Sequence, residues 1–156
     1  MREILFRGKR IDNGELVYGW LCRVGDKYAN IVEKDTEVLY SVLTNTIGQY
    51  TGLTDKNGKK IFEGDIVRLF DISVGEIVQE CGAFGIGCRK QIDYDYLASE
   101  IAPVTGNNNT PMFCYNDNFV SLWELWWNYN EEDDNISVIE VIGNIHDNPE
   151  LLEVTE

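Results

Sequence analysis

Few side chains in this sequence have the types and spacing that catalysis requires. The single histidine, His146, follows a predicted strand with no Ser or Cys nucleophile beside it in the sequence, so a surface or capping role is favoured over catalysis. Glu63 and Asp65 alternate at the entry to another predicted strand and would point the same way. Because no third ligand or partner group accompanies this pair, turn formation is favoured over a metal or acid–base site.

The four cysteines do not have the paired short spacings of a structural zinc site, since six residues separate Cys81 from Cys88. Without a secretory signal the thiols are expected to be reduced. A role as small buried hydrophobes is therefore favoured over zinc bound by Cys22, Cys81, Cys88 and Cys114 together.

Two further segments resemble ligand-binding loops only superficially. The glycines Gly82, Gly85 and Gly87 are not followed by the Lys-Ser/Thr pair of a phosphate-binding loop. The acidic run from Glu131 to Asp134 lacks the alternation and central glycine of a calcium loop. We therefore identify no catalytic residue, no metal site and no cofactor.

A tryptophan-rich stretch is the best candidate for partner binding. Trp123, Trp127 and Val120 are predicted to share a helix face with Trp126 on its flank, and a core role is favoured over an exposed interface. Since acidic residues follow directly, the candidate partner patch consists of Trp123, Trp126, Trp127, Glu131, Glu132, Asp133 and Asp134.

Charge is unevenly distributed along the chain of 156 residues, whose 13 Lys and Arg and 27 Asp and Glu give a net charge of −14. Residues 1–90 contain 13 basic and 13 acidic residues, whereas residues 91–156 contain 14 acidic residues and no Lys or Arg. An acidic field repels phosphate, so direct nucleic-acid binding is disfavoured. The short basic cluster of Arg7, Lys9 and Arg10 is interpreted as protection of an edge strand rather than as an RNA contact.

The first half of the chain reads as short strands separated by turn signals. The dipeptides Asn13-Gly14, predicted as a type I′ turn, and Asn57-Gly58 each indicate a hairpin. The predicted strands are 3–7, 15–22, 28–33, 37–43, 50–55, 59–62, 66–70 and 75–79. Short strands at this spacing indicate small sheets or a barrel.

The second half carries weaker signals. Residues 81–88 are predicted as a loop or irregular hairpin, and 93–101 as a short helix. Residues 119–129 are predicted as a helix in preference to a strand, with Ser121 and Glu124 in a capping-box pattern. A strand over 136–145 and a short helix starting at Pro149 complete the pattern.

Two long segments, 47–67 and 141–152, resemble the YopX protein family, and Phe6–Arg10 with Tyr18-Gly19 fits the same family. The resemblance covers about 1–80 and 138–152, and it implies a phage or prophage context, a β-rich fold with an SH3-type barrel, and no characterised activity. The matching positions are interpreted as structural: Gly52, Asn57, Gly58, Glu63, Gly64, Asp65, Gly143, Asn144, Asn148 and Pro149.

These observations predict a mainly-β protein. Residues 1–47 are expected to form a β-hairpin region, and 48–156 an SH3-like small barrel closed by a strand at 141–143. The barrel would carry a variable acidic and aromatic insertion at about 82–137, and one or two short helices in the C-terminal half.

The favoured function is a non-enzymatic accessory or interaction protein in the bacterial cytoplasm. Its partner would be a second copy, with Lys59 and Lys60 of one copy near acidic residues of the other, or a host or phage protein. The alternatives are an acidic DNA mimic that inhibits a basic nucleic-acid enzyme and, third, a carboxylate-dependent hydrolase. No apolar run is long enough to cross a membrane.

Overall fold

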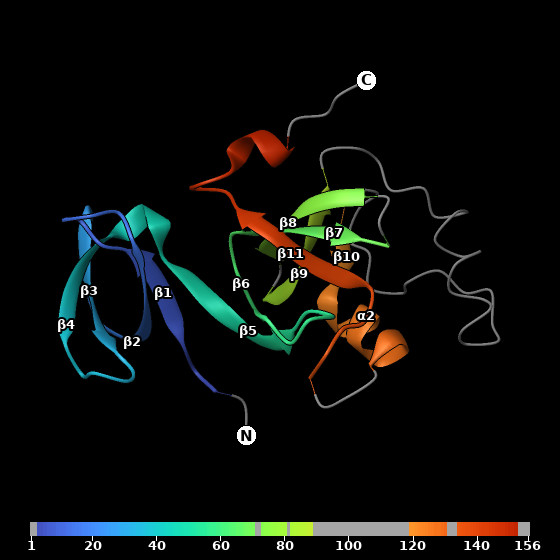
Figure 1. Ribbon diagram of the computed structural model, residues 1–156, viewed down its shortest axis with the longest axis horizontal. Helices are drawn as coiled ribbons and strands as arrows, with labels where there is room; N and C mark the ends of the chain where they lie inside the picture. The colour runs from blue at the N-terminus through green and yellow to red at the C-terminus, as the bar shows by residue number, and fades with distance from the viewer. Residues whose placement is uncertain (1–2, 71–72, 81, 89–118, 131–133, 153–156) are drawn as a thin grey trace. The chain divides into compact units, whose positions relative to one another are not determined.

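The computed structural model describes residues 3–70, 73–80, 82–88, 119–130 and 134–152 (Figure 1). The chain forms two compact units, Met1–Gly52 and Leu53–Glu156, a division a few residues beyond the sequence-predicted boundary between 47 and 48. Every strand pairing within the two sheets is antiparallel. The mainly-β prediction is therefore confirmed.

The first unit is a meander around a small apolar core. Its strands are β1 (Phe6–Lys9), β2 (Leu16–Val24), β3 (Tyr28–Glu33), β4 (Leu39–Leu43) and the first part of β5 (Gly48–Thr54), with the 3-10 turn η1 (Thr44–Thr46) before β5. The sheet order is β4-β3-β2-β1-β5-β6, where β6 (Lys60–Phe62) follows the second hairpin. Strand alternation directs Val17, Ala29, Ile31 and Val42 into the core.

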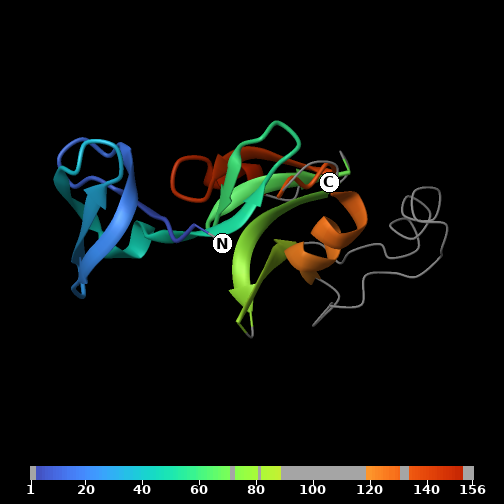
Figure 2. The same cartoon turned by 90° about the horizontal axis from the view of Figure 1, so that it is seen from below.

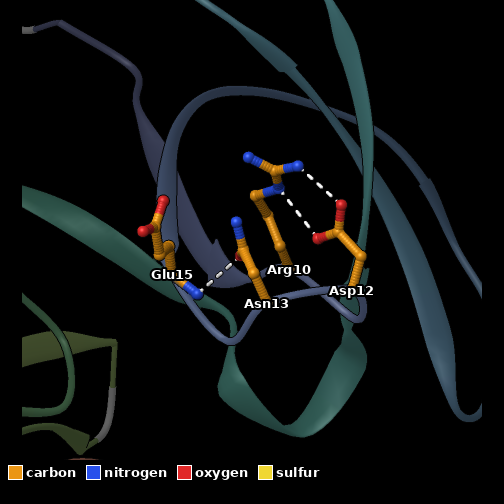
Figure 3. Close-up of polar contacts among 4 residues, drawn as sticks. All are labelled: Arg10, Asp12, Asn13 and Glu15. Carbon is orange, nitrogen blue, oxygen red and sulfur yellow. Dashed lines mark hydrogen bonds and ion pairs between the residues drawn. The ribbon is translucent and has the colours of Figure 1, made fainter.

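The β1–β2 hairpin forms as predicted, but its turn is not of type I′. Only Gly14 of the Asn13-Gly14 pair adopts a positive φ, 74°. The loop closes through Arg10 N–H to Glu15 O at 2.9 Å, and the Asn13 side-chain oxygen accepts from Glu15 N–H at 2.9 Å (Figure 3). Because Asn13 contributes its side chain to the loop, its backbone does not need a left-handed conformation.

The second unit contains a five-stranded sheet in the order β10-β9-β8-β7-β11. Its strands are β7 (Asp65–Leu69), β8 (Ser73–Glu80), β9 (Ala83–Cys88), β10 (Phe119–Ser121) and β11 (Ile139–Asn144). Helix α2 (Leu122–Tyr129) follows β10 directly and lies against β9 and β10 (Figure 2). Within the described residues β10 and β11 are the outer strands, so the sheet is not a closed barrel.

One large core unites this sheet and α2. It includes Ile77 from β8, Ile86 from β9, Leu125 from α2 and Ile139 from β11, each at most 1 % exposed. The outer edge of β11 is covered by the segment after β5, since Lys56 N–H donates to Ile139 O at 2.9 Å.

Local expectations for the second half are confirmed in part. Residues 81–88 include a regular strand that pairs with β8, so the hairpin alternative is correct and the loop is wrong. The helix predicted over 119–129 is confirmed for 122–129, whereas 119–121 form β10, and Ser121 occupies the N-cap position. Its side chain makes no capping hydrogen bond, because it is buried at the end of β10, and the capping box is therefore wrong.

The last two predicted elements are present with altered bounds or geometry. The strand predicted from residue 136 begins at Ile139, because 137–138 form a turn. The C-terminal helix is the 3-10 helix η2 (Pro149–Leu152). The helix predicted over 93–101 lies outside the described residues.

Candidate interaction surface

Helix α2 places two tryptophans on the outside of the second unit. Leu122, Leu125 and Tyr129 are buried against the core. Trp123 and Trp127 lie one turn apart on the opposite side of the helix and are 56 % and 72 % exposed. We call Trp123, Trp126 and Trp127 the Trp surface.

The three indoles of the Trp surface contact one another in sequence. The Trp123 and Trp126 rings stack with their centroids 4.9 Å apart, and Trp126 meets Trp127 at 6.2 Å with a 57° tilt. Trp126 is half-buried and also packs against the core. Trp126 therefore anchors two exposed rings, which is a preorganised aromatic surface.

The sequence interpretation of these residues was correct only for part of the set. Val120 does not share a helix face with Trp123 and Trp127, because it lies in β10 and is fully buried. The favoured core role describes Trp126 better than Trp123 or Trp127. Of the acidic members of the patch, Asp134 is exposed, while Glu131, Glu132 and Asp133 lie outside the described residues.

The family-motif residues at the second hairpin form a tight turn. Gly58 adopts a φ of 80° and its N–H donates to Asp55 O at 3.0 Å. The Asp55 carboxylate accepts from Asn57 N–H and Lys59 N–H, each at 2.9 Å. Gly52, on β5 just before this hairpin, also has a positive φ, 90°.

Asp55 was not among the predicted site residues, although its carboxylate accepts three backbone N–H groups. Its second oxygen accepts from Val141 N–H of β11 at 2.9 Å, and the residue is only 1 % exposed. The local signal was the Asp-x-Asn-Gly order of an Asx turn, but no local pattern indicates a bond across 86 positions.

The Glu63-Gly64-Asp65 segment is a turn held by one of its carboxylates. Asp65 is buried, and its Oδ2 accepts from Phe62 N–H at 2.8 Å. Gly64 has a φ of 91°, a conformation that glycine adopts without strain. Glu63 is half-buried. The Asp65 carboxylate therefore supplies a hydrogen-bond acceptor to the backbone of the turn. This is the turn-forming role that the sequence favoured over acid–base chemistry.

The second motif forms a turn after β11. Asn144 Oδ1 accepts from the N–H groups of His146 and Asp147, both at 3.0 Å, and Asn148 Oδ1 accepts from Asn144 N–H at 3.3 Å. A Cβ on Gly143 would lie 2.6 Å from Asn148 Oδ1, so any other residue there would displace the Asn148 side chain from Asn144 N–H. Pro149 then starts η2. His146 is thus a half-buried turn residue.

Three titratable groups of the first unit, Arg10, Asp12 and Lys34, have shifted pKa values. The Asp12 carboxylate accepts from Arg10 Nε at 3.0 Å and from Arg10 Nη2 at 2.6 Å (Figure 3), and these bonds lower the pKa of Asp12 and raise the pKa of Arg10. The ion pair with Glu3 raises the pKa of Lys34. Both pairs are on the surface, where ion pairs contribute little to stability.

The part of the chain that the structure describes contains no cluster of side chains that could bind a metal ion. No group of three or more His, Cys, Asp or Glu side chains lies close enough there to hold a metal ion. Cys22 is exposed, with its Sγ 3.7 Å from Trp20 O, so its predicted burial is wrong. Cys88 belongs to β9, and Cys81 and Cys114 lie outside the described residues.

The chain was compared with known protein families. The family model described as YopX protein matches residues 6–153. The chain belongs to the YopX protein family. The match spans both units, and its range includes 82–137, the predicted variable insertion.

A solved structure and the curated proteins complete the comparison. The crystal structure of protein EF1440 from Enterococcus faecalis is similar to this YopX chain at 24% identity, with 98% of this chain and 100% of that chain covered and a TM-score of 0.47. No curated protein matches the chain. Among the described helices, none has the length and apolar character needed to cross a bilayer.

Proposed function

We propose that this YopX-family protein is a non-enzymatic accessory protein that acts by binding other proteins and that also self-associates. The observation that carries the proposal is the exposure of Trp123 and Trp127 on consecutive turns of α2. Tryptophan is the residue most enriched at binding hot spots, and a folded chain gains nothing by leaving two such rings in water.

The chemistry of the unit around the Trp surface indicates the class of partner. Residues 53–156 contain 6 basic and 20 acidic residues, and α2 itself has an acidic residue, Glu124, in its first turn and no basic residue in its last. A host or phage protein with cationic groups around an apolar pocket would match the charge and the indole rings together.

Binding through the Trp surface is tested by affinity capture from host lysate at low salt. The doubly substituted Trp123→Ala/Trp127→Ala protein should lose the captured partner, whereas Val38→Ala, which truncates a 45 % exposed side chain in the first unit, should retain it. Equal capture of the partner by the wild type, the double variant and Val38→Ala would refute the proposal.

The second candidate is an acidic DNA mimic. It is favoured by the concentration of all the net charge, −14, in residues 53–156, whose field would suit a basic nuclease groove. Binding of this kind would survive loss of Trp123 and Trp127 and would fall steeply with salt. The third candidate is a carboxylate-dependent hydrolase, which needs two carboxylates placed for acid–base chemistry. The buried carboxylates of Asp55 and Asp65 instead accept backbone N–H groups.

A further inference from the structure

A second exposed apolar face lies on the first unit. In the sheet register Trp20 of β2 stands opposite Val32 of β3, and Val32 stands opposite Leu39 of β4. Directly opposed residues share one face of a sheet, and Tyr18 joins them because it lies two positions before Trp20. We call Tyr18, Trp20, Val32 and Leu39 the β2–β4 face.

This face is not needed for the core of its own unit. The core residues Val17, Ala29 and Ile31 alternate with it along the same strands and point to the other side. Tyr18, Trp20 and Leu39 remain 39 %, 46 % and 57 % exposed. Tyr18, Trp20 and Leu39 thus present large apolar side chains to solvent around the half-buried Val32, which marks an interaction site.

The charges of the first unit are balanced. Residues 1–52 contain seven basic and seven acidic residues. Beside the face, Lys34 N–H donates to Tyr18 O at 3.2 Å, and the Lys34 ammonium pairs with Glu3. The Lys34 charge on this rim is therefore neutralised by Glu3, and the guanidinium-bearing Arg7 of β1, which stands opposite Tyr18, is only 4 % exposed.

Charge also determines which surfaces of two copies can meet. Each copy carries its whole net charge of −14 in residues 53–156, so two copies that meet through their second units oppose like charges. Two copies that meet through their first units join electrically neutral surfaces and cover the exposed rings of both.

We propose that the occupant of the β2–β4 face is the same face of a second copy, in a two-fold symmetric dimer. The proposal rests on the self-association in the proposed function and assigns its contact. It replaces the expected contact between Lys59 or Lys60 and acidic residues of another copy. The contact is apolar, so added salt leaves the dimer intact or strengthens it by screening repulsion between the acidic units, whereas an ionic contact weakens in salt.

The test is sedimentation equilibrium of the full chain at low and high salt, with Leu39→Glu and Trp20→Ser as disruptive variants. Leu39→Glu changes a mostly exposed side chain, and circular dichroism verifies that each variant is folded. Matched controls are Leu151→Glu, which adds the same charge at a 37 % exposed position of the second unit, and Trp127→Ala on the Trp surface.

The expected result is a wild-type dimer at both salt concentrations and a rise of about tenfold or more in the dimer dissociation constant for both disruptive variants. The two controls should remain dimeric. A monomeric wild type, a dimer that dissociates in salt, or a dimer indifferent to Leu39→Glu and Trp20→Ser would each overturn the proposal. The capture experiment tests the Trp surface separately. If the Trp123→Ala/Trp127→Ala protein loses the captured partner but remains dimeric, the Trp surface is supported as the partner site. If it retains the partner, the Trp surface is refuted and the β2–β4 face is not affected.

Discussion

At the scale of single residues, the Asp55 carboxylate connects parts of the second unit that are distant in sequence. It accepts two N–H groups of its own hairpin turn and one from Val141 in β11. At 1 % exposure, no water can replace these bonds. Buried N–H groups that lose their acceptor retain the full cost of desolvation, so the residue is a structural anchor.

Replacing Asp55 with Ala should lower the free energy of unfolding by about 3 kcal/mol, because three backbone N–H groups lose their acceptor. Asp55→Asn keeps one acceptor oxygen and should lose about half as much. Urea unfolding followed by circular dichroism measures both, and Asp35→Ala, at an exposed position, is the control. Equal stability of Asp55→Ala and the control would contradict the assigned role.

The Arg10–Asp12 pair predicts a pH effect of known sign. Hydrogen bonds from Arg10 lower the pKa of Asp12 below its ordinary 3.8, so the pair's stabilisation is present above that value and is lost as pH falls through the folded-state pKa. NMR titration of the Asp12 side chain should show this low midpoint, and Arg10→Gln should raise it towards 3.8. Arg23→Gln should leave it unchanged; an unshifted Asp12 in the wild type would contradict the geometry.

At the scale of elements, α2 divides its tryptophans between two roles. Trp126 packs against the core that contains Leu125, whereas Trp127 is 72 % exposed. Adjacent residues on a helix point in directions about 100° apart, so one step along the chain separates a supporting ring from a surface ring.

Trp126→Ala should therefore lower the free energy of unfolding by about 2 kcal/mol, while Trp127→Ala should change it by less than about 0.5 kcal/mol. Thermal and urea unfolding measure the difference. An equal loss of unfolding free energy in the two variants would show that both rings are packed alike. It would contradict the exposure of Trp127 on the Trp surface.

The close approach of β2 and β3 gives another prediction at this scale. A Cβ on Gly19 would lie 1.8 Å from Val32 O, a backbone atom that cannot move away without breaking the pairing. Gly19→Ala should destabilise the first unit by about 2 kcal/mol or more. Gly87→Ala is the matched control, since its Cβ would meet Val78 Cγ2 at an ordinary 3.4 Å. A tolerated Gly19→Ala would show that the strands are further apart.

At the scale of the whole molecule, charge divides the chain at the boundary between its two units. By sequence alone the net charge of −14 falls in residues 91–156. The unit boundary at Gly52–Leu53 assigns the same net charge to a larger body, residues 53–156, with 6 basic and 20 acidic residues. Self-repulsion within one unit destabilises its folded state and is screened by salt.

Sodium chloride should consequently raise the melting temperature of the second unit by a few degrees, with little effect on the neutral first unit. Glu150→Gln, at an exposed position in η2, should raise the melting temperature in low salt and reduce its response to salt. Differential scanning calorimetry follows both quantities. A melting temperature that falls with salt would show that attractive ion pairs, rather than repulsion, dominate this unit.

The sequence by itself determined the strand pattern, the two Asn-Gly hairpins, a helix within 119–129, the family and the imbalance of charge. These features depend on neighbours a few positions apart: alternation produces strands, and glycine permits the left-handed turns at Gly14 and Gly58. Local pattern was sufficient for them because their physical causes are local.

Only the tertiary structure decided which aromatic residues are exposed and which carboxylate is an anchor. The helical pattern separates Trp127 from Trp126, but which of them is buried depends on the strands that pack beside α2. Asp55 acquires its third bond from Val141, and the β2–β4 face exists only when three strands align in register. Burial and register depend on residues far apart in the chain, so they emerge only when the chain folds.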